Sequence, residues 1–214
     1  MTAPPKAPAA PLTLLHTSAA HVPVFDALRD RHHPDAVLRH LVVPELLERA
    51  RAHGPESVAP DVRELLEGVA GPVLVTCSSI GAIGESLAPD LGVAVLRVDR
   101  PMAAAAVRTG PRILVLATVE STLAPTVGML EEEATGPVAI RTQVVAGAWD
   151  RFAAGDAAGC RALVAAAADA VADADVIVLA QASMAGAEDL TTTTTPVFSS
   201  PRTGLAAALG APAV

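Results

Sequence analysis

The sequence is organised around the segment Val73-Leu-Val-Thr-Cys-Ser-Ser-Ile-Gly-Ala-Ile-Gly84. Its three leading apolar residues predict a short strand that is buried on both faces. The hydroxyl and small residues that follow predict a turn into a helix, where backbone N–H groups and the helix dipole point at a bound anion. The segment therefore predicts one strand-to-helix unit of a parallel sheet, with an anion-binding loop at the carboxyl end of the strand.

Similar apolar runs recur along the chain and alternate with longer segments of helical pattern. The strand candidates, all rich in Val, Ile and Leu, are Leu12 to Leu15, Val37 to Val43, Val73 to Val75, Val93 to Val98, Ile113 to Ala117, Val138 to Val145, Val176 to Leu179 and Pro196 to Phe198. Between them, residues 50–69 and 157–174 have helical spacing and predict crossover helices. This alternation predicts an α/β fold built on mainly parallel sheets.

An internal repeat is superimposed on this alternation. Residues 72–87 resemble residues 175–190, and anchoring Ser79 on Ser183 gives an offset of 104, which places Cys77 opposite Gln181. A second alignment, at an offset of 101, places Thr17 opposite Thr118. A third alignment, at an offset of 100, pairs Pro101 with Pro201 and extends back to Val98 and Phe198. Three matches in the same order along the chain predict an internal duplication.

The duplication predicts two similar α/β domains that face each other, with pseudo-twofold symmetry. We expect a disordered leader over residues 1–11, a first domain made of residues 12–99 plus 197–214, and a second domain over residues 100–196. In parallel sheets the loops after the strand carboxyl ends hold the ligand. The candidate site therefore lies in the cleft between the two domains.

Composition excludes several classes of function. The chain has 214 residues, of which 51% are hydrophobic and 18% charged, as expected for a globular protein. An aromatic content of 2% and a net charge of −8 oppose nucleic-acid binding. The apolar runs are far shorter than the roughly 20 residues that cross a membrane. The two cysteines form no CxxC pair, so we expect neither a disulfide nor a zinc site. We therefore expect a cytoplasmic location. A homodimer is compatible with the apolar composition.

The hydroxyl-rich loops predict two anion cradles, and hence a small carboxylate as substrate. The candidate substrate-binding residues are Thr17, Ser18, Thr76, Ser78, Ser79, Thr118, Ser121, Thr122 and Ser183. Cys77 lies inside the first cradle, where the same N–H groups favour a thiolate over a thiol. Cys77 is therefore a candidate acid, base or nucleophile.

Each candidate also has a purely structural interpretation. A cysteine at the end of a buried strand often serves as a small hydrophobic residue, although the hydroxyl groups around Cys77 favour a functional role. Cys160 lies in an Ala-rich helical segment and is predicted to be structural. His32, His33 and His40 have no acidic or cysteine partner at ligand spacing, which favours a solvated helix or loop over a metal site. His16 and His21 follow the first strand, and for them substrate contact and a structural role are equally weighted.

Several motifs of this chain resemble those of the aspartate/glutamate racemase superfamily, which includes hydantoin racemases, maleate isomerases and arylmalonate decarboxylases. The resemblance extends from Leu12 onward and rests on Val75-Thr-Cys-Ser-Ser79 and Thr118-Val-Glu-Ser-Thr122. It implies two flavodoxin-like domains, an active site between them and no cofactor. In racemases of this superfamily, a cysteine from each half exchanges a proton with one face of the substrate. The second-half motif, usually Gly-Cys-Ala-Gly-Met or Gly-Cys-Thr, reads Ala180-Gln-Ala-Ser-Met184 in this chain.

This departure leaves Cys77 as the single thiol of the expected site, because Gln181 cannot exchange a proton at accessible pH. The leading hypothesis is a one-cysteine isomerase or decarboxylase, in which Gln181 donates a hydrogen bond to a carboxylate or to a developing enolate. A racemase whose second base is not a cysteine, with His21 as first candidate, is one alternative. A non-catalytic protein that binds a carboxylate metabolite is another.

Overall fold

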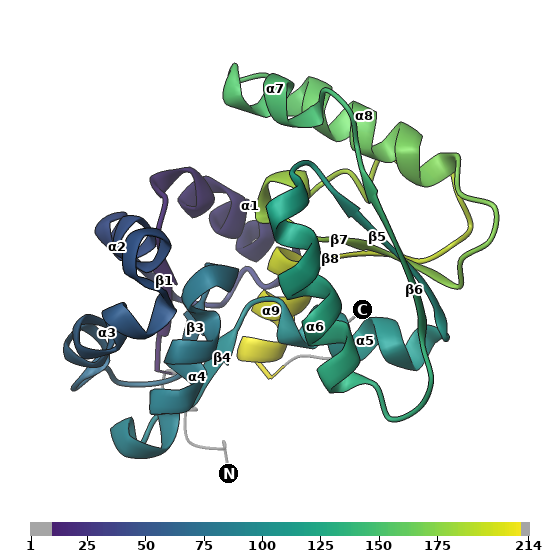
Figure 1. Ribbon diagram of the computed structural model, residues 1–214. Helices are drawn as coiled ribbons and strands as arrows, with labels where there is room; N and C mark the ends of the chain where they lie inside the picture. Colours follow the sequence, from purple (N-terminus) through teal and green to yellow (C-terminus); the bar gives the residue numbers. More distant parts are fainter. Residues whose placement is uncertain (1–9, 211–214) are drawn as a thin grey trace, which may run out of the picture.

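The computed structural model describes residues 10–210 of the chain. It contains two four-stranded sheets, and every strand pair in them is parallel. The first sheet has the order β2-β1-β3-β4 and the second the order β6-β5-β7-β8 (Figure 1). The strands are β1 (Leu12–His16), β2 (Leu38–Val42), β3 (Val73–Val75), β4 (Val95–Arg97), β5 (Arg112–Ala117), β6 (Ala139–Val144), β7 (Val176–Leu179) and β8 (Val197–Ser199). The predicted fold class, two flavodoxin-like α/β units, is confirmed.

All eight predicted strands are present, whereas one predicted helix is wrong. The segment expected to form a single helix over residues 50–69 contains the end of α2 (Glu45–His53), the 3₁₀ helix η2 (Pro55–Val58) and α3 (Ala59–Leu66). The interruption falls at Gly54, whose φ of 86° ends α2. The second predicted crossover helix is confirmed, with α8 spanning Ala157–Asp169. Of the leader predicted over residues 1–11, only Ala10 and Pro11 lie within the described residues.

Helices cover both faces of the first sheet. One face packs against α2, α3 and α4 (Ser78–Leu91), through a core that includes Leu15, Val75 and Ile80. The opposite face packs against α1 (Val22–His32) and α9 (Ser200–Ala208), through Leu14, Phe25 and other apolar side chains. The alternation of side chains along a strand explains this division, because neighbours on β1 point to opposite faces.

The second sheet has the same layered construction. One face packs against α5 (Arg100–Thr109) and α6 (Leu123–Glu133), and the other against α7 (Ala148–Ala153) and α8. Cys160 of α8 is fully buried in the latter core, as expected for a structural residue, and burial raises the pKa of its thiol.

Two helices cross between the halves. The helix α5 follows the last strand of the first sheet but packs on the second sheet, and α9 follows the last strand of the second sheet but packs on the first. The predicted boundary at residue 197 is therefore wrong for β8, which pairs with β7 in the second sheet. Strand hydrogen bonds keep β8 with β7, and the apolar face of α9 joins the first domain. Residues 211–214 of the predicted first domain lie outside the described residues.

The strand register tests the internal repeat. Leu14 pairs with Leu74 in the first sheet, and their equivalents Val115 and Val178 pair in the second, which confirms the offsets of 101 and 104 together. The third offset, predicted to be 100, is wrong within the strands: Phe198 occupies the position equivalent to Leu96, at an offset of 102. The offset of 100 holds at the helices that follow, since α5 begins at Arg100 and α9 at Ser200. Two additional residues between β4 and α5 account for the change.

The halves differ most in the segment that follows the third strand of each sheet. In the first half this segment is the 14-residue helix α4, whereas in the second it is the three-residue 3₁₀ helix η4 (Ala182–Met184) and a loop that includes residues 191–195. Glycines let α4 lie close to its sheet. A Cβ atom on Gly84 would lie 2.6 Å from Cγ2 of Val75, and one on Gly81 would lie 2.7 Å from Cβ of Arg97. Among residues 10–210, no helix is long and apolar enough to cross a membrane.

Candidate functional site

The predicted site residues follow the carboxyl ends of the two central strands of each sheet. Thr17 follows β1 and Cys77 follows β3, one residue after Thr76; these two strands are neighbours. In the second half Thr118 follows β5 and Gln181 follows β7, and these strands are also neighbours. Ligands of parallel sheets bind at such strand ends.

Cys77 marks the start of α4 and has an extended backbone, with φ −106° and ψ 114°. Its side chain is 8% exposed and packs at the edge of the core between the first sheet and α4. The next two residues, Ser78 and Ser79, form the exposed first turn of α4. The first N–H groups of a helix lack partners within the helix. The thiol therefore lies beside a set of donors suited to a carboxylate.

A buried polar chain lies beneath Cys77, and sequence reasoning missed it. Thr76 donates its hydroxyl hydrogen to the Leu15 carbonyl (3.1 Å), and Nδ1 of His16 lies 2.7 Å from the same Thr76 oxygen. Because the hydroxyl has only one hydrogen, His16 must be the donor and carries its proton on Nδ1. Nε2 of His16 then accepts a hydrogen bond from Nδ1 of His40 (2.8 Å), and Nε2 of His40 faces Oδ1 of Asp26 at 3.4 Å.

This buried polar chain favours the structural role over substrate contact for His16, and it corrects the interpretation favoured for His40. The His16 side chain is fully buried and both of its nitrogens have partners within the protein, so it is not a substrate contact. Burial, His40 and His21 lower the pKa of His16 to about 3, which keeps the ring neutral. His40 lies on β2 with a side chain only 17% exposed, rather than in a solvated helix or loop. The signal available in the sequence was a histidine as the last residue of a buried strand.

Gln181 occupies the position equivalent to Cys77, and its orientation is fixed. Its Oε1 accepts hydrogen bonds from the backbone N–H of Thr118 (2.6 Å) and from the Thr118 hydroxyl (2.9 Å). A backbone N–H can only donate, which assigns the oxygen of the side-chain amide and not its nitrogen to this contact. The NH₂ group of Gln181 is therefore the end that remains for other partners. Thr118, by contrast, has used both of its donors within the protein.

The other predicted contacts divide into exposed residues and residues with local structural roles. Ser18 caps η1 (Ala19–His21) by accepting a hydrogen bond from the Ala20 N–H at 3.3 Å. Thr122 donates to the Val119 carbonyl (2.9 Å) at the end of η3 (Glu120–Thr122). Ser121 is exposed and Ser183 is half-buried. Thr17 is buried, and among the described residues its side chain forms no hydrogen bond.

The remaining histidines were considered as substrate or metal contacts. His21 ends η1, and its Nδ1 is buried without a hydrogen-bond partner within residues 10–210. Burial lowers the pKa of His21 and favours its neutral form. His32 and His33 lie at the carboxyl end of α1, whereas η1 precedes the amino end of this helix. Over the described part of the chain, no three His, Cys, Asp or Glu side chains are grouped as metal ligands would be.

Solved structures of similar fold extend over almost the whole chain. An aspartate racemase homologue from Pyrococcus horikoshii is 10% identical, with a TM-score of 0.68, and the match covers 94% of this chain and 97% of that one. An allantoin racemase from Pseudomonas fluorescens is 17% identical, with a TM-score of 0.67 and coverages of 95% and 92%. An arylmalonate decarboxylase is 19% identical, with a TM-score of 0.61 and coverages of 93% and 91%.

No protein-family model matches the chain, and no curated protein matches its sequence. The structural neighbours match the superfamily that the motifs resemble, and the chain has the fold of that superfamily. At sequence identities of 10–19%, the likeness establishes the fold.

Proposed function

We propose that this protein is a cofactor-independent isomerase or decarboxylase that acts on a small carboxylate in the cleft between its two halves. Cys77 serves as its single thiol, as a proton donor and acceptor or as a nucleophile, and Gln181 serves as a hydrogen-bond donor. One observation carries the proposal: the symmetry-equivalent positions after β3 and β7 hold a thiol on one side and an amide with a fixed orientation on the other. A site built in this way can exchange a proton with one face of a substrate.

The first half offers the donors that a substrate carboxylate requires. The N–H groups at the start of α4, beside Ser78 and Ser79, belong to a helix whose dipole favours an anion at this end. Thr17 is a buried residue whose side chain forms no hydrogen bond within the described residues. In the second half Thr118 is occupied by Gln181, so that Gln181 rather than Thr118 is the proposed contact.

Gln181 is suited to stabilise charge but not to move a proton. Its oxygen is engaged with Thr118, which leaves two N–H hydrogens for a carboxylate or a developing enolate oxygen. A fixed donor needs no reorganisation when charge develops, and this property makes such donors effective in catalysis.

A single thiol is sufficient for both proposed reactions. In a decarboxylation, the bond between the α-carbon and one carboxyl group breaks, CO₂ leaves, and the electron pair stays as an enolate. Cys77 then transfers its proton to the α-carbon, and the thiolate regains a proton from water. In an isomerisation, the Cys77 thiolate adds to an activated carbon–carbon double bond, which forms a carbon–sulfur bond and leaves an enolate. Rotation about the resulting single bond follows. The enolate then restores the double bond as the carbon–sulfur bond breaks and its electron pair returns to the thiolate.

The buried polar side chains beneath Cys77 support this assignment. Thr76 is bonded to its neighbour strand and to His16, and His16 is held in turn by His40. We assign His16 as a positioning residue that fixes the backbone on which Cys77 lies. The proposal needs no change of protonation at His16, because its depressed pKa keeps the ring neutral.

Reaction in deuterated water tests the one-thiol mechanism. The substrates are a disubstituted malonate, a cis-unsaturated dicarboxylate and the two enantiomers of a 2-substituted carboxylic acid. We expect turnover of one of the first two; in the malonate case the product contains one deuterium and a single configuration. Exchange and racemisation starting from both enantiomers would overturn the proposal in favour of a two-base racemase.

The two-base alternative has one observation in its favour, the neutral His21 with its unpartnered Nδ1. His21 belongs to the same half of the molecule as Cys77, whereas a second base acting on the opposite substrate face is expected from the second half. Substitution His21→Gln would abolish racemisation in that mechanism but leave one-face protonation in place. A non-catalytic carboxylate-binding protein would show no turnover on any substrate, and Cys77→Ala would retain full ligand affinity.

A further inference from the structure

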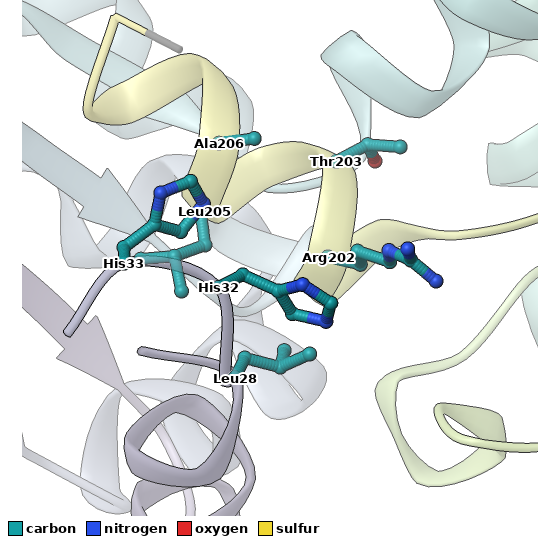
Figure 2. A pocket seen from close by; sticks show the side chains of 7 residues that line it. All are labelled: Leu28, His32, His33, Arg202, Thr203, Leu205 and Ala206. Carbon is teal, nitrogen blue, oxygen red and sulfur yellow. The ribbon is translucent and has the colours of Figure 1, made fainter. Parts of the chain in front are cut away.

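A cavity lies outside the candidate site, between the helices α1 and α9. The helices α1 and α9 pack side by side through the core that contains Phe25 and Leu205 (Figure 1). Toward the end of α1 they enclose a pocket of about 150 Å³. Figure 2 shows its lining side chains, which include Leu28, His32 and His33 from the α1 segment and Arg202 from α9.

The pocket has an apolar floor. Leu205 and Ala206 of α9 are 1% and 7% exposed and form its base, with Leu28 on the opposite helix. The hydroxyl of Thr203, also in the lining, is already donated to the Ser199 carbonyl at 3.0 Å. The wall therefore favours hydrocarbon over a polar ligand group.

The rim of the pocket is basic, on a protein whose net charge is −8. His32, His33 and Arg202 line it, and Arg31 precedes His32. The acidic residue that faces this cluster, Asp189, is shared: its Oδ2 accepts from Arg31 at 2.6 Å, and its Oδ1 lies 3.6 Å from Arg202. Among residues 10–210, Arg202 donates no hydrogen bond, and its guanidinium remains available to a ligand.

The local electrostatics agree with this description. The pKa of His32 is lowered by partial desolvation and by the positive charges of Arg202 and Arg31, together with His33, while Asp189 opposes the shift. A negative charge bound at the rim would act in the opposite direction and raise the pKa of His32. A rise in the pKa of His32 would therefore indicate that an anion is bound at this position.

We propose that this pocket, distinct from the proposed site around Cys77 and Gln181, binds a small monocarboxylate with a short apolar chain, with the carboxylate on Arg202 and His32 and the chain on Leu205 and Leu28. Arg202 can hold a carboxylate through two parallel N–H donors. The volume is about half the lower limit of roughly 300 Å³ that is usual for drug-sized ligands, which excludes nucleotides and favours an acid of a few carbon atoms. The inference does not depend on the reaction proposed for the cleft.

Titration of the full chain with n-butyrate at constant ionic strength tests the proposal. The readout is the NMR signal of the His32 ring, assigned with the variant His32→Gln. We expect butyrate to raise the pKa of His32 in a saturable manner, and n-butylamine at the same concentrations to leave it unchanged. Arg202→Gln should weaken butyrate binding about tenfold or more, because a hydrogen bond to a charged group is lost. Arg202 is 33% exposed at its side chain, and this substitution should leave the melting temperature close to that of the parent.

Two control variants make the outcome decisive. Arg108→Gln removes an exposed arginine of α5 that does not line the pocket, and should leave butyrate binding unchanged. Cys77→Ala alters the cleft and should leave the His32 response unchanged as well. Equal weakening by Arg108→Gln would indicate a nonspecific charge effect, and loss of the response in Cys77→Ala would place the acid in the cleft. Either result, or the lack of any His32 response to butyrate, would overturn the inference.

Discussion

The two halves of this molecule share a strand order and a register, yet they differ at the residues closest to the candidate site. In both, the residue after the third strand donates its N–H to the first strand: Thr76 to Leu15 at 3.0 Å, and Ala180 to Leu116 at 2.9 Å. The backbone is thus the same. Beneath Cys77, however, lie the side chains of His16 and Thr76, whereas the equivalent positions beneath Gln181 are Ala117 and Ala180.

A second difference concerns the segment that each position leads into. Cys77 begins a 14-residue helix, whose aligned peptide dipoles favour negative charge at its start. Gln181 begins a three-residue 3₁₀ helix, which is too short to provide a comparable dipole. The duplicated scaffold has therefore kept its backbone geometry in both halves, whereas the buried polar side chains, the long helix with its dipole and the thiol are all in the first half.

The sharpest test of this asymmetry compares Cys77→Ala with Gln181→Ala. We expect Cys77→Ala to reduce kcat about 10²- to 10⁴-fold, because it removes the proposed acid and base. Gln181→Ala should cost about tenfold to a hundredfold, as expected for one hydrogen bond to developing charge. Steady-state kinetics on the substrate identified in deuterated water provides both values, and thermal melting checks the fold. Equal losses in the two variants would contradict the asymmetric site.

The polar side chains beneath Cys77 can be replaced one at a time by the alanines that the second half has at the equivalent positions. His16→Ala should lower the free energy of unfolding by about 2–4 kcal/mol, because it opens a cavity and removes the hydrogen bonds that His16 forms with the Thr76 oxygen and with Nδ1 of His40. Adding Thr76→Ala recreates the alanine pair of the second half, and its extra cost should be smaller than the cost of Thr76→Ala alone. Urea unfolding of the parent, both single variants and the double variant measures the coupling. Strict additivity would show that the His16–Thr76 contact contributes nothing.

The glycines of α4 provide a comparison with the helices of the second half. Gly84→Ala should destabilise the protein by about 1–3 kcal/mol, because its Cβ would lie 2.6 Å from Val75 and 3.3 Å from Val95. The matched control is Gly128→Ala in α6, where an added Cβ meets no atom within 4 Å. This control should stabilise the protein by up to about 1 kcal/mol through its higher helix propensity. Thermal unfolding of both variants checks the contrast, and a neutral Gly84→Ala would show that α4 can move away from its sheet.

The buried histidine of the first half predicts a dependence of stability on pH that the second half cannot share. His16 has an ordinary pKa of 6.5 when unfolded and about 3 when folded. Between these values the unfolded chain binds a proton that the folded chain does not bind. Stability should therefore fall as pH decreases from about 6.5 toward 3, by at most about 1.4 kcal/mol per pH unit from this group.

The control for this dependence is His16→Ala, in which the slope of unfolding free energy against pH between pH 6 and 4 should be smaller by about one proton. His21 shifts in the same direction and leaves a residual slope in the variant. Urea unfolding across this pH range provides the comparison. An unchanged slope in His16→Ala would mean that His16 is not the buried neutral group.

Much of the fold was predictable because buried parallel strands leave a plain pattern in the sequence. The Val- and Leu-rich run of β3 and its equivalent in β7 are apolar on both faces, and their repeat gave the correct register. The predicted helix over residues 50–69 failed at Gly54, because apolar spacing does not reveal the positive φ with which this glycine ends α2 before Pro55. Likewise, β8 and α9 are contiguous in sequence but join different layers.

For the site, the residues after each strand could be chosen from the sequence because strand ends in a parallel sheet collect at one edge. The internal repeat was enough to identify Gln181 as the residue equivalent to Cys77. The contacts among His16, His40 and Asp26 depend on three elements, β1, β2 and α1, whose separations in the chain carry no common pattern. The same holds for the pocket between α1 and α9, whose lining residues lie at opposite ends of the chain. Local patterns of polarity thus specify which residues reach a sheet edge, while side-chain hydrogen bonds between distant segments exist only once packing has brought those segments into contact.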